Sequence, residues 1–185
     1  MMYRCLIANR GEIAVRIIRA CRELNIETVA IYAKGDENSL HVSLADQAIC
    51  IGEANPLDSY LNIDRIISAA KVTESNVIHP GYGCLSESTN FAKAVEDNHI
   101  HFIGPSKTTM EMMGDKITAR QTVKQAGVPV IPGSNDAVQS VDEIKLLSKE
   151  IGFPVVLKAA SGGGGKGIRI VKEASHLDQA LKEAK

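Results

Sequence analysis

The sequence predicts an α/β fold in which a parallel sheet with helices on both faces is followed by a smaller unit built on a strand pair. Short apolar runs alternate with segments of helical periodicity over the first half of the chain, and this alternation favours a covered parallel sheet. The first strand, helix and strand fit within about 30 residues, the length of a βαβ unit. A glycine-rich run between two further apolar runs predicts the strand pair.

The first half supplies the elements of the sheet. We expect strands over residues 5–8, 28–32, 48–51, 76–79 and 100–103. The first helix is expected to bury a stripe made of Ile13, Ile17, Ala20, Cys21 and Leu24. Later helices are expected around Ile63, Ile66, Ile67 and Ala70, and around Phe91, Ala92 and Val95.

The second half is expected to be helical over residues 106–126, with a break at Gly114 and Asp115 as the N-cap of the second piece. Ser140 and Glu143 form a capping box that opens the next helix. Strands follow over 153–157 and 168–171, and a last helix opens at Ser175. We predict a domain at 1–104, a helical linker at 105–129 and a partial domain at 130–185, which we expect to be cut short because a two-stranded hairpin is marginal alone.

Composition excludes several classes of function. The net charge is -1, aromatic residues make up 4% of the chain and tryptophan is absent, so a nucleic-acid binder is not expected. Neither a signal peptide nor a membrane span is expected from the apolar runs. The cysteines form no C-x-x-C pair, and we expect buried free thiols in a reducing cytoplasm. They are Cys5, Cys21, Cys50 and Cys84.

A glycine-rich loop joins the two strands of the second half and is interpreted as a flap over nucleotide phosphates. Without side-chain bulk, backbone amides approach an anion closely. Lys158 precedes the loop. The loop itself contains Gly162, Gly163, Gly164, Gly165, Lys166 and Gly167.

Other interpretations of this loop are less favourable. The G-x-G-x-x-G pattern is present, but a dinucleotide site requires a helix after the loop, and a strand follows. The Walker pattern fails because Gly167 stands where Ser or Thr is required. A flexible hairpin without a ligand is the remaining alternative, and the flanking lysines disfavour it.

A second glycine-containing loop follows the predicted strand at 76–79. It includes His79, Pro80, Gly81, Tyr82 and Gly83. The carboxyl end of a central strand is where ligands bind in open α/β sheets, so His79 and Tyr82 are candidate ligand contacts. The alternative is that His79 only forms hydrogen bonds with backbone groups and that Tyr82 packs on the second domain. The residues alone leave both interpretations open.

Four motifs in this order resemble biotin carboxylases of the ATP-grasp superfamily. They cover residues 7–14, 79–83, 113–116 and 158–167. The resemblance implies a Rossmann-like parallel-sheet domain, called the pre-ATP-grasp domain, followed by an incomplete ATP-grasp lid domain. Within this family, the chain most resembles the biotin carboxylase component of bacterial acetyl-CoA carboxylase. Pyruvate and propionyl-CoA carboxylases share the same motifs.

The resemblance also implies a reaction and a set of site residues. Biotin carboxylases use MgATP and bicarbonate to carboxylate biotin on a biotin carboxyl carrier protein, and carboxyltransferase subunits then carboxylate acetyl-CoA in fatty-acid synthesis. Lys116 and Lys158 match nucleotide contacts, and the glycine loop matches the phosphate flap. His79, Tyr82 and Gly83 match the biotin-facing loop. Arg19 and Glu23 match a dimer contact of the full-length homodimer, although a surface i,i+4 pair explains them equally well.

Departures from the family limit what this chain is expected to do. Cys84 and Ser88 stand where the family has Phe and Asn. The Mg²⁺-binding glutamates, the bicarbonate arginine and the catalytic base are expected beyond Lys185, so we expect no metal site and no catalytic residue in this chain, which alone is expected to be inactive. A non-catalytic dimerisation or assembly module is the alternative. A carbamoyl-phosphate synthetase-like ligase is disfavoured by the 79–83 loop.

Overall fold

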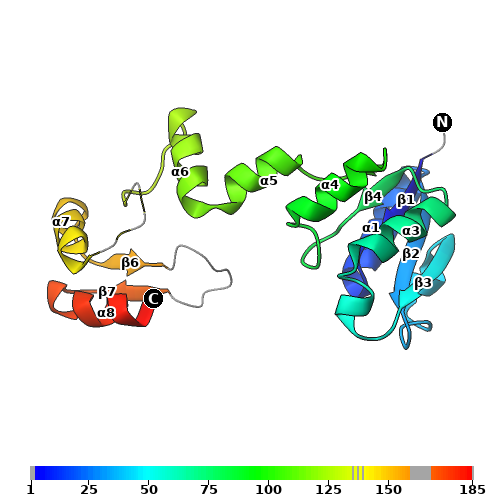
Figure 1. The fold of residues 1–185 in the computed structure, drawn as a ribbon, viewed down its shortest axis with the longest axis horizontal. Helices are drawn as coiled ribbons and strands as arrows, with labels where there is room; N and C mark the ends of the chain where they lie inside the picture. Colours follow the sequence, from blue (N-terminus) through cyan, green and yellow to red (C-terminus); the bar gives the residue numbers. More distant parts are fainter. Residues whose placement is uncertain (1–2, 135, 137, 139, 159–167, 185) are drawn as a thin grey trace. The chain divides into compact units, whose positions relative to one another are not determined.

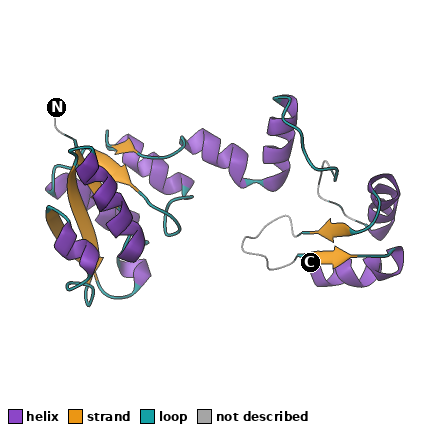
Figure 2. Ribbon diagram, turned by 180° about the vertical axis from the view of Figure 1, so that it is seen from behind, coloured by secondary structure: helices purple, strands orange, loops and turns teal. Residues whose placement is uncertain are grey.

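The computed structural model describes residues 3–134, 136, 138, 140–158 and 168–184. It divides into unit 1, residues 1–110, and unit 2, residues 111–185. Figure 1 shows the elements of each unit along the chain, and Figure 2 shows them from behind. In the described part, no helix is both long and apolar enough to cross a membrane.

Unit 1 is built on a parallel sheet with the strand order β3-β2-β1-β4-β5. The strands are β1 (Arg4–Ile7), β2 (Glu27–Ala33), β3 (Gln47–Gly52), β4 (Val77–His79) and β5 (His101–Phe102). The predicted strands of this sheet are confirmed, and each predicted end lies within one residue of the observed end. The first strand of the chain therefore lies at the centre of the sheet.

Helices cover both faces of this sheet (Figure 1). The helices between the strands are α1 (Gly11–Glu23), α2 (Leu40–Leu44), α3 (Ile63–Val72) and α4 (Thr89–Asp97), and the exposed 3₁₀ turn η1 (Pro56–Asp58) precedes α3. Because side chains alternate along a strand, Leu6 of β1 packs in one core with residues of α3 and α4, and Ile7 packs in a second core with residues of α1. Thus both sides of β1 are buried.

Two burial predictions in unit 1 are wrong. Leu24 and Ala20 are exposed, and the stripe that α1 buries is Ala14, Val15, Ile17, Ile18 and Cys21. Leu24 is the C-cap residue and lies one position beyond the last residue of the helix. The cysteines also differ, because only Cys5 and Cys21 are buried. Cys50 lies on the edge strand β3 and Cys84 in the loop after β4, and both thiols are exposed.

The predicted break in the helix over 106–126 is confirmed. It separates α5 (Lys107–Gly114) from α6 (Lys116–Gln125). The carboxylate of Asp115 accepts a hydrogen bond from the backbone N–H of Thr118 at 2.8 Å, as an N-cap residue does. Gly127, with φ of +77°, follows the end of α6.

Unit 2 contains an antiparallel strand pair packed against two helices. Its remaining elements are α7 (Val141–Ile151), β6 (Val155–Leu157), β7 (Arg169–Val171), the 3₁₀ turn η2 (Ala174–His176) and α8 (Leu177–Ala184). The predicted cap is confirmed, since the Ser140 hydroxyl accepts from the N–H of Glu143 at 3.2 Å. Val171 and Leu177 are buried in a small core with Ile144.

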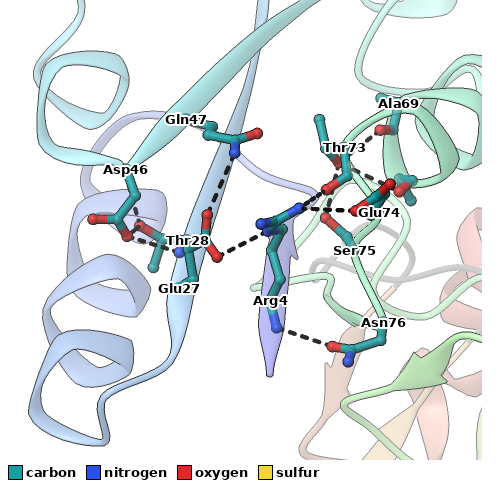
Figure 3. Close-up of polar contacts among 11 residues, drawn as sticks. Arg4, Glu27, Thr28, Asp46, Gln47, Ala69, Thr73, Glu74, Ser75 and Asn76 are labelled. Atoms are coloured by element: carbon teal, nitrogen blue, oxygen red, sulfur yellow. Dashed lines mark hydrogen bonds and ion pairs between the residues drawn. The ribbon is translucent and has the colours of Figure 1, made fainter. Parts of the chain in front are cut away.

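Polar contacts close the amino-terminal edge of the sheet (Figure 3). The guanidinium of Arg4 lies 3.0 Å from the carboxylate of Glu27 and donates to the carbonyl of Thr73 at 2.6 Å. Beside it, the hydroxyl of Thr28 donates to Asp46 at 2.6 Å, and the hydrogen bonds from Thr28 lower the pKa of that carboxyl group. These contacts tie the beginnings of the strands together.

Candidate functional site

The carboxyl-terminal edge of the sheet in unit 1 is the candidate site. The chain proceeds from β1 to β2 and β3 on one side, and then returns to β4 and β5 on the other side of β1. In parallel sheets, such a reversal opens a ligand crevice beyond the strand ends. Ile7 pairs with His79 across β1 and β4, so the segments that follow these two strands meet at this reversal.

Asn9, just beyond β1, holds the loop that follows β4. Its side-chain Nδ2 donates to the carbonyl of Pro80 at 2.8 Å and to the carbonyl of Tyr82 at 2.9 Å. Its Oδ1 accepts from the backbone N–H of Arg10 at 2.9 Å. Both donor hydrogens of this buried amide are therefore used to fix one loop.

A hydrogen bond within the loop also fixes its backbone. The N–H of Gly81 donates to Nδ1 of His79 at 3.0 Å, which requires a neutral imidazole protonated at Nε2. Burial lowers the pKa of His79 and so favours this neutral form. His79 is half-buried, and the backbone contact supports the structural interpretation left open by the sequence.

Tyr82 differs from His79 because its side chain is 67% exposed. Asn9 binds only the backbone of Tyr82, so the ring is left available to a ligand. Gly83 follows with φ of +65°, and Cys84 with φ of +45°. The loop therefore presents one aromatic ring from a fixed backbone.

A groove beside Tyr82 runs along the exposed face of α1, with a volume of about 1130 Å³. Arg19 and Glu23 line it, as do Arg16 and residues of α2. Among the described residues, the structure has no ion pair between Arg19 and Glu23 or between Glu12 and Arg16, so the i,i+4 interpretation is not supported. The sequence-predicted dimer residues and Tyr82 therefore line one groove.

A second polar cluster lies beyond β2 at the same edge. The Tyr60 hydroxyl donates to the carboxylate of Asp36 at 2.7 Å and accepts from the N–H of Ala33 at 3.1 Å. The Arg10 guanidinium lies 3.3 Å from the same carboxylate and 5.4 Å from the centre of the Tyr60 ring. Burial raises the pKa of Tyr60, which stays protonated. No motif in the sequence predicts this cluster, since Asp36 and Tyr60 lie in loops.

His41, on α2, lines the same groove but is itself only 1% exposed. Its Nε2 lies 3.2 Å from the carbonyl oxygen of Ile31, and its Nδ1 has no hydrogen-bond partner in the described structure. Burial lowers the pKa of His41, the charge of Asp36 raises it, and the charge of Arg10 lowers it. The ring is therefore held neutral at pH 7.

Acidification is expected to destabilise unit 1 through His41. The pKa of the folded-state ring lies below the ordinary value of about 6.5. Stability contributed by the neutral ring is therefore complete above about pH 6.5 and is lost as the pH falls toward the folded-state pKa, by at most about 1.4 kcal/mol per pH unit. H41Q removes this titration and retains a side-chain donor. Its free energy of unfolding should fall less than that of the wild type between pH 6.5 and 5.

Urea unfolding followed by tyrosine fluorescence measures this difference. All four tyrosines lie in unit 1 and the chain has no tryptophan, so the signal reports on that unit alone. H101Q is the matched control, because His101 is an exposed histidine of the same unit. Equal pH dependence in H41Q, H101Q and the wild type would contradict the prediction.

In unit 2, Lys158 directly follows β6 and its side chain is exposed. Val156 and Ile170 form a cross-strand pair, and both side chains are exposed. Because alternate residues share a face of a strand, Lys158 and Val156 lie on the same side. This exposed apolar face was not predicted from the sequence, although Ile170 alternates with buried Val171.

Of the other residues predicted to contact the nucleotide, the structure describes only Lys116. Lys116 is the first residue of α6 and is exposed. Gly162, Gly163, Gly164, Gly165, Lys166 and Gly167 lie outside the described residues.

A family model described as the N-terminal domain of biotin carboxylase matches residues 1–110, more than half of the chain. The chain belongs to the biotin carboxylase family. A second family model, described as the ATP binding domain of the carbamoyl-phosphate synthase L chain, matches residues 115–185. Together the two matches include both candidate regions of this biotin carboxylase family member.

Individual relatives agree with this assignment. Biotin carboxylase 1 of Bacillus subtilis is 53% identical over 182 residues, which cover 98% of this chain and 40% of the relative. A biotin carboxylase–beta-gamma-ATP complex from Campylobacter jejuni matches the whole chain and 41% of its own length, with a TM-score of 0.90 and 47% identity.

A third relative is the biotin carboxylase domain dimer of Hydrogenobacter thermophilus 2-oxoglutarate carboxylase, solved with MgADP, ADP and bicarbonate. It matches with a TM-score of 0.87 and 49% identity over 100% of this chain and 40% of its own. The chain therefore spans about 40% of the length of these biotin carboxylase relatives.

Proposed function

We propose that this chain forms the N-terminal part of a biotin carboxylase. The full-length enzyme uses ATP, Mg²⁺ and bicarbonate to carboxylate biotin held on a biotin carboxyl carrier protein. The observation that carries this proposal is the match of the whole chain, at 47% identity, to the biotin carboxylase–beta-gamma-ATP complex.

The residues of this chain contribute binding and orientation to the proposed reaction. Phosphoryl transfer depends mainly on positioning and charge neutralisation, and Lys116 and Lys158 supply exposed positive charge in unit 2. The exposed apolar pair Val156 and Ile170 offers a surface on which a nucleotide base packs. Tyr82 presents its ring to the biotin.

Mg²⁺ neutralises charge on the nucleotide phosphates when it is bound. Among the described residues, no group of three histidine, cysteine, aspartate or glutamate side chains is arranged to hold a metal ion. We therefore assign none of the described residues to Mg²⁺.

The downstream acceptor is proposed to be acetyl-CoA, with carboxyltransferase subunits as partners in fatty-acid synthesis. The proposal rests on the motif resemblance, and a pyruvate or propionyl-CoA carboxylase is the alternative. The 2-oxoglutarate carboxylase domain is 49% identical, so the degree of identity does not distinguish these acceptors. The four free cysteines support a reducing, cytoplasmic setting.

A second candidate function is a dimerisation or assembly module. Arg19 and Glu23 line the groove beside Tyr82 without pairing with each other, so their charges are available to a second subunit. A related domain was solved as a dimer. Homodimerisation of the full-length enzyme is compatible with both candidate functions.

Replacing Lys158 with glutamine in the full-length enzyme tests the proposed activity. A charge-assisted contact to phosphate is worth about 1.5–3 kcal/mol, so K158Q should raise the KM for ATP at least about tenfold in a bicarbonate- and biotin-dependent ATPase assay. K149Q is the control, because Lys149 is an exposed lysine on α7. Wild-type enzyme without biotin-dependent ATP cleavage would overturn the proposed function.

A further inference from the structure

We propose that Asn9 is the positioning residue for the substrate-facing ring of Tyr82. The inference rests on the proposed function, because the substrate that it concerns is the biotin group. The hydrogen bonds that Asn9 makes to the 79–83 loop go to its backbone and not to the Tyr82 ring. Asn9 acts on the backbone that carries the ring, through hydrogen bonds to the carbonyls of Pro80 and Tyr82.

The chemistry of the contact requires an amide at position 9. Two carbonyl oxygens converge on one nitrogen at 2.8 and 2.9 Å, and a primary amide nitrogen has two hydrogens to donate. Pro80 has no N–H of its own, so this part of the loop has little means of bonding to β1 through its backbone. The buried side chain of Asn9 supplies hydrogen bonds from the β1 side to this part of the loop.

The surroundings keep the amide in place. The Oδ1 of Asn9 accepts from the N–H of Arg10, which sets the orientation of the side chain. Gly81 lies so close that an added Cβ would come within 2.6 Å of Nδ2. The neighbouring backbone is anchored as well, since the N–H of Ala8 donates to the carbonyl of His79 at 2.8 Å. The amide is therefore held in one place, and Tyr82, which is 67% exposed, lines the groove.

Aspartate is the sharpest replacement because it has the shape of asparagine without its donors. In N9D, a carboxylate oxygen faces two carbonyl oxygens, and repulsion displaces the loop and the Tyr82 ring. N9S removes the donors without adding a charge, so it should act in the same direction and more weakly. N98D is the matched control, because the Nδ2 of Asn98 also donates to a backbone carbonyl, that of Ala94, at 2.7 Å.

The test is steady-state kinetics of the full-length enzyme with free biotin as the probe. N9D should raise the KM for biotin at least tenfold and leave the KM for ATP within twofold, since Lys116 and Lys158 lie in unit 2. N9S should raise the KM for biotin about threefold, and N98D should change neither constant. Hydrogen exchange of the Gly81 and Tyr82 amides should accelerate in N9D and stay unchanged in N98D.

Several results overturn the inference. An active wild type with an unchanged KM for biotin in N9D overturns it alone, as does an equal rise in both KM values. Failure of both N9D and N9S to fold assigns Asn9 a structural role and overturns it too. A wild type that does not carboxylate biotin overturns the proposed function and this inference together.

Discussion

Replacing Gly81 with alanine is expected to destabilise unit 1 by about 3 kcal/mol. Gly81 has φ of +67°, and this left-handed conformation costs other residues about 1–2 kcal/mol. The added Cβ would also lie 2.6 Å from Nδ2 of Asn9 and 2.8 Å from Cγ2 of Ile13. Both neighbours are anchored, so relieving the overlap should cost a further 1–3 kcal/mol, roughly as overpacking of a core does.

Gly83 provides the matched control for this substitution. Its φ of +65° is almost the same, and an added Cβ would meet nothing within 4 Å. G83A should therefore cost only the conformational part, about 1–2 kcal/mol. Urea unfolding followed by tyrosine fluorescence gives both values, and equal losses in the two variants would show that the predicted overlap with Asn9 is absent.

Replacing Phe91 with alanine is expected to destabilise unit 1 by about 3–5 kcal/mol. Phe91 is fully buried on α4, in the core that also contains Leu6 of β1. Its ring meets that of Phe102 edge to face, with centroids 5.9 Å apart, and such pairs add to the free energy of burial. The substitution leaves a cavity and removes this ring contact.

The large loss of stability expected for F91A should arise because Phe91 is buried, and not merely because an apolar side chain is removed. Leu57 is 69% exposed on η1 of the same unit, so L57A should change the free energy of unfolding by less than about 0.5 kcal/mol. Thermal and urea unfolding of both variants provide the comparison. A loss below about 1.5 kcal/mol in F91A would contradict the packing described for α4.

Local patterns predicted most of the elements because their causes are local. The caps at Asp115 and Ser140 depend on residues three positions apart, and such spacings are visible in a sequence. The short helix α2 was missed because five residues are too few to show a period. Its buried histidine, His41, also contradicts the expectation that polar residues lie outside.

The candidate site was predicted less completely because its contacts are distant in sequence. The motifs identified the loop at 79–83, but the hydrogen bonds from Asn9 cross more than 70 residues and leave no periodic signal. Helix ends were also hard to place, since Asn25, Glu74 and His99 adopt positive φ without being glycine. These three residues end α1, α3 and α4 by adopting a left-handed backbone conformation, as glycine commonly does. Their residue types do not reveal this conformation.

The central position of β1 has a consequence for biosynthesis. The ribosome synthesises β1, β2 and β3 before β4, and β2 lies between β3 and one edge of β1 in the folded sheet. During this interval the other edge of β1 exposes unpaired backbone groups, which attract any strand that approaches. We therefore expect the nascent chain to be most vulnerable to mispairing after β1, β2 and β3 have been synthesised and before β4 emerges. We expect a chaperone that covers exposed strand edges to bind it within that window.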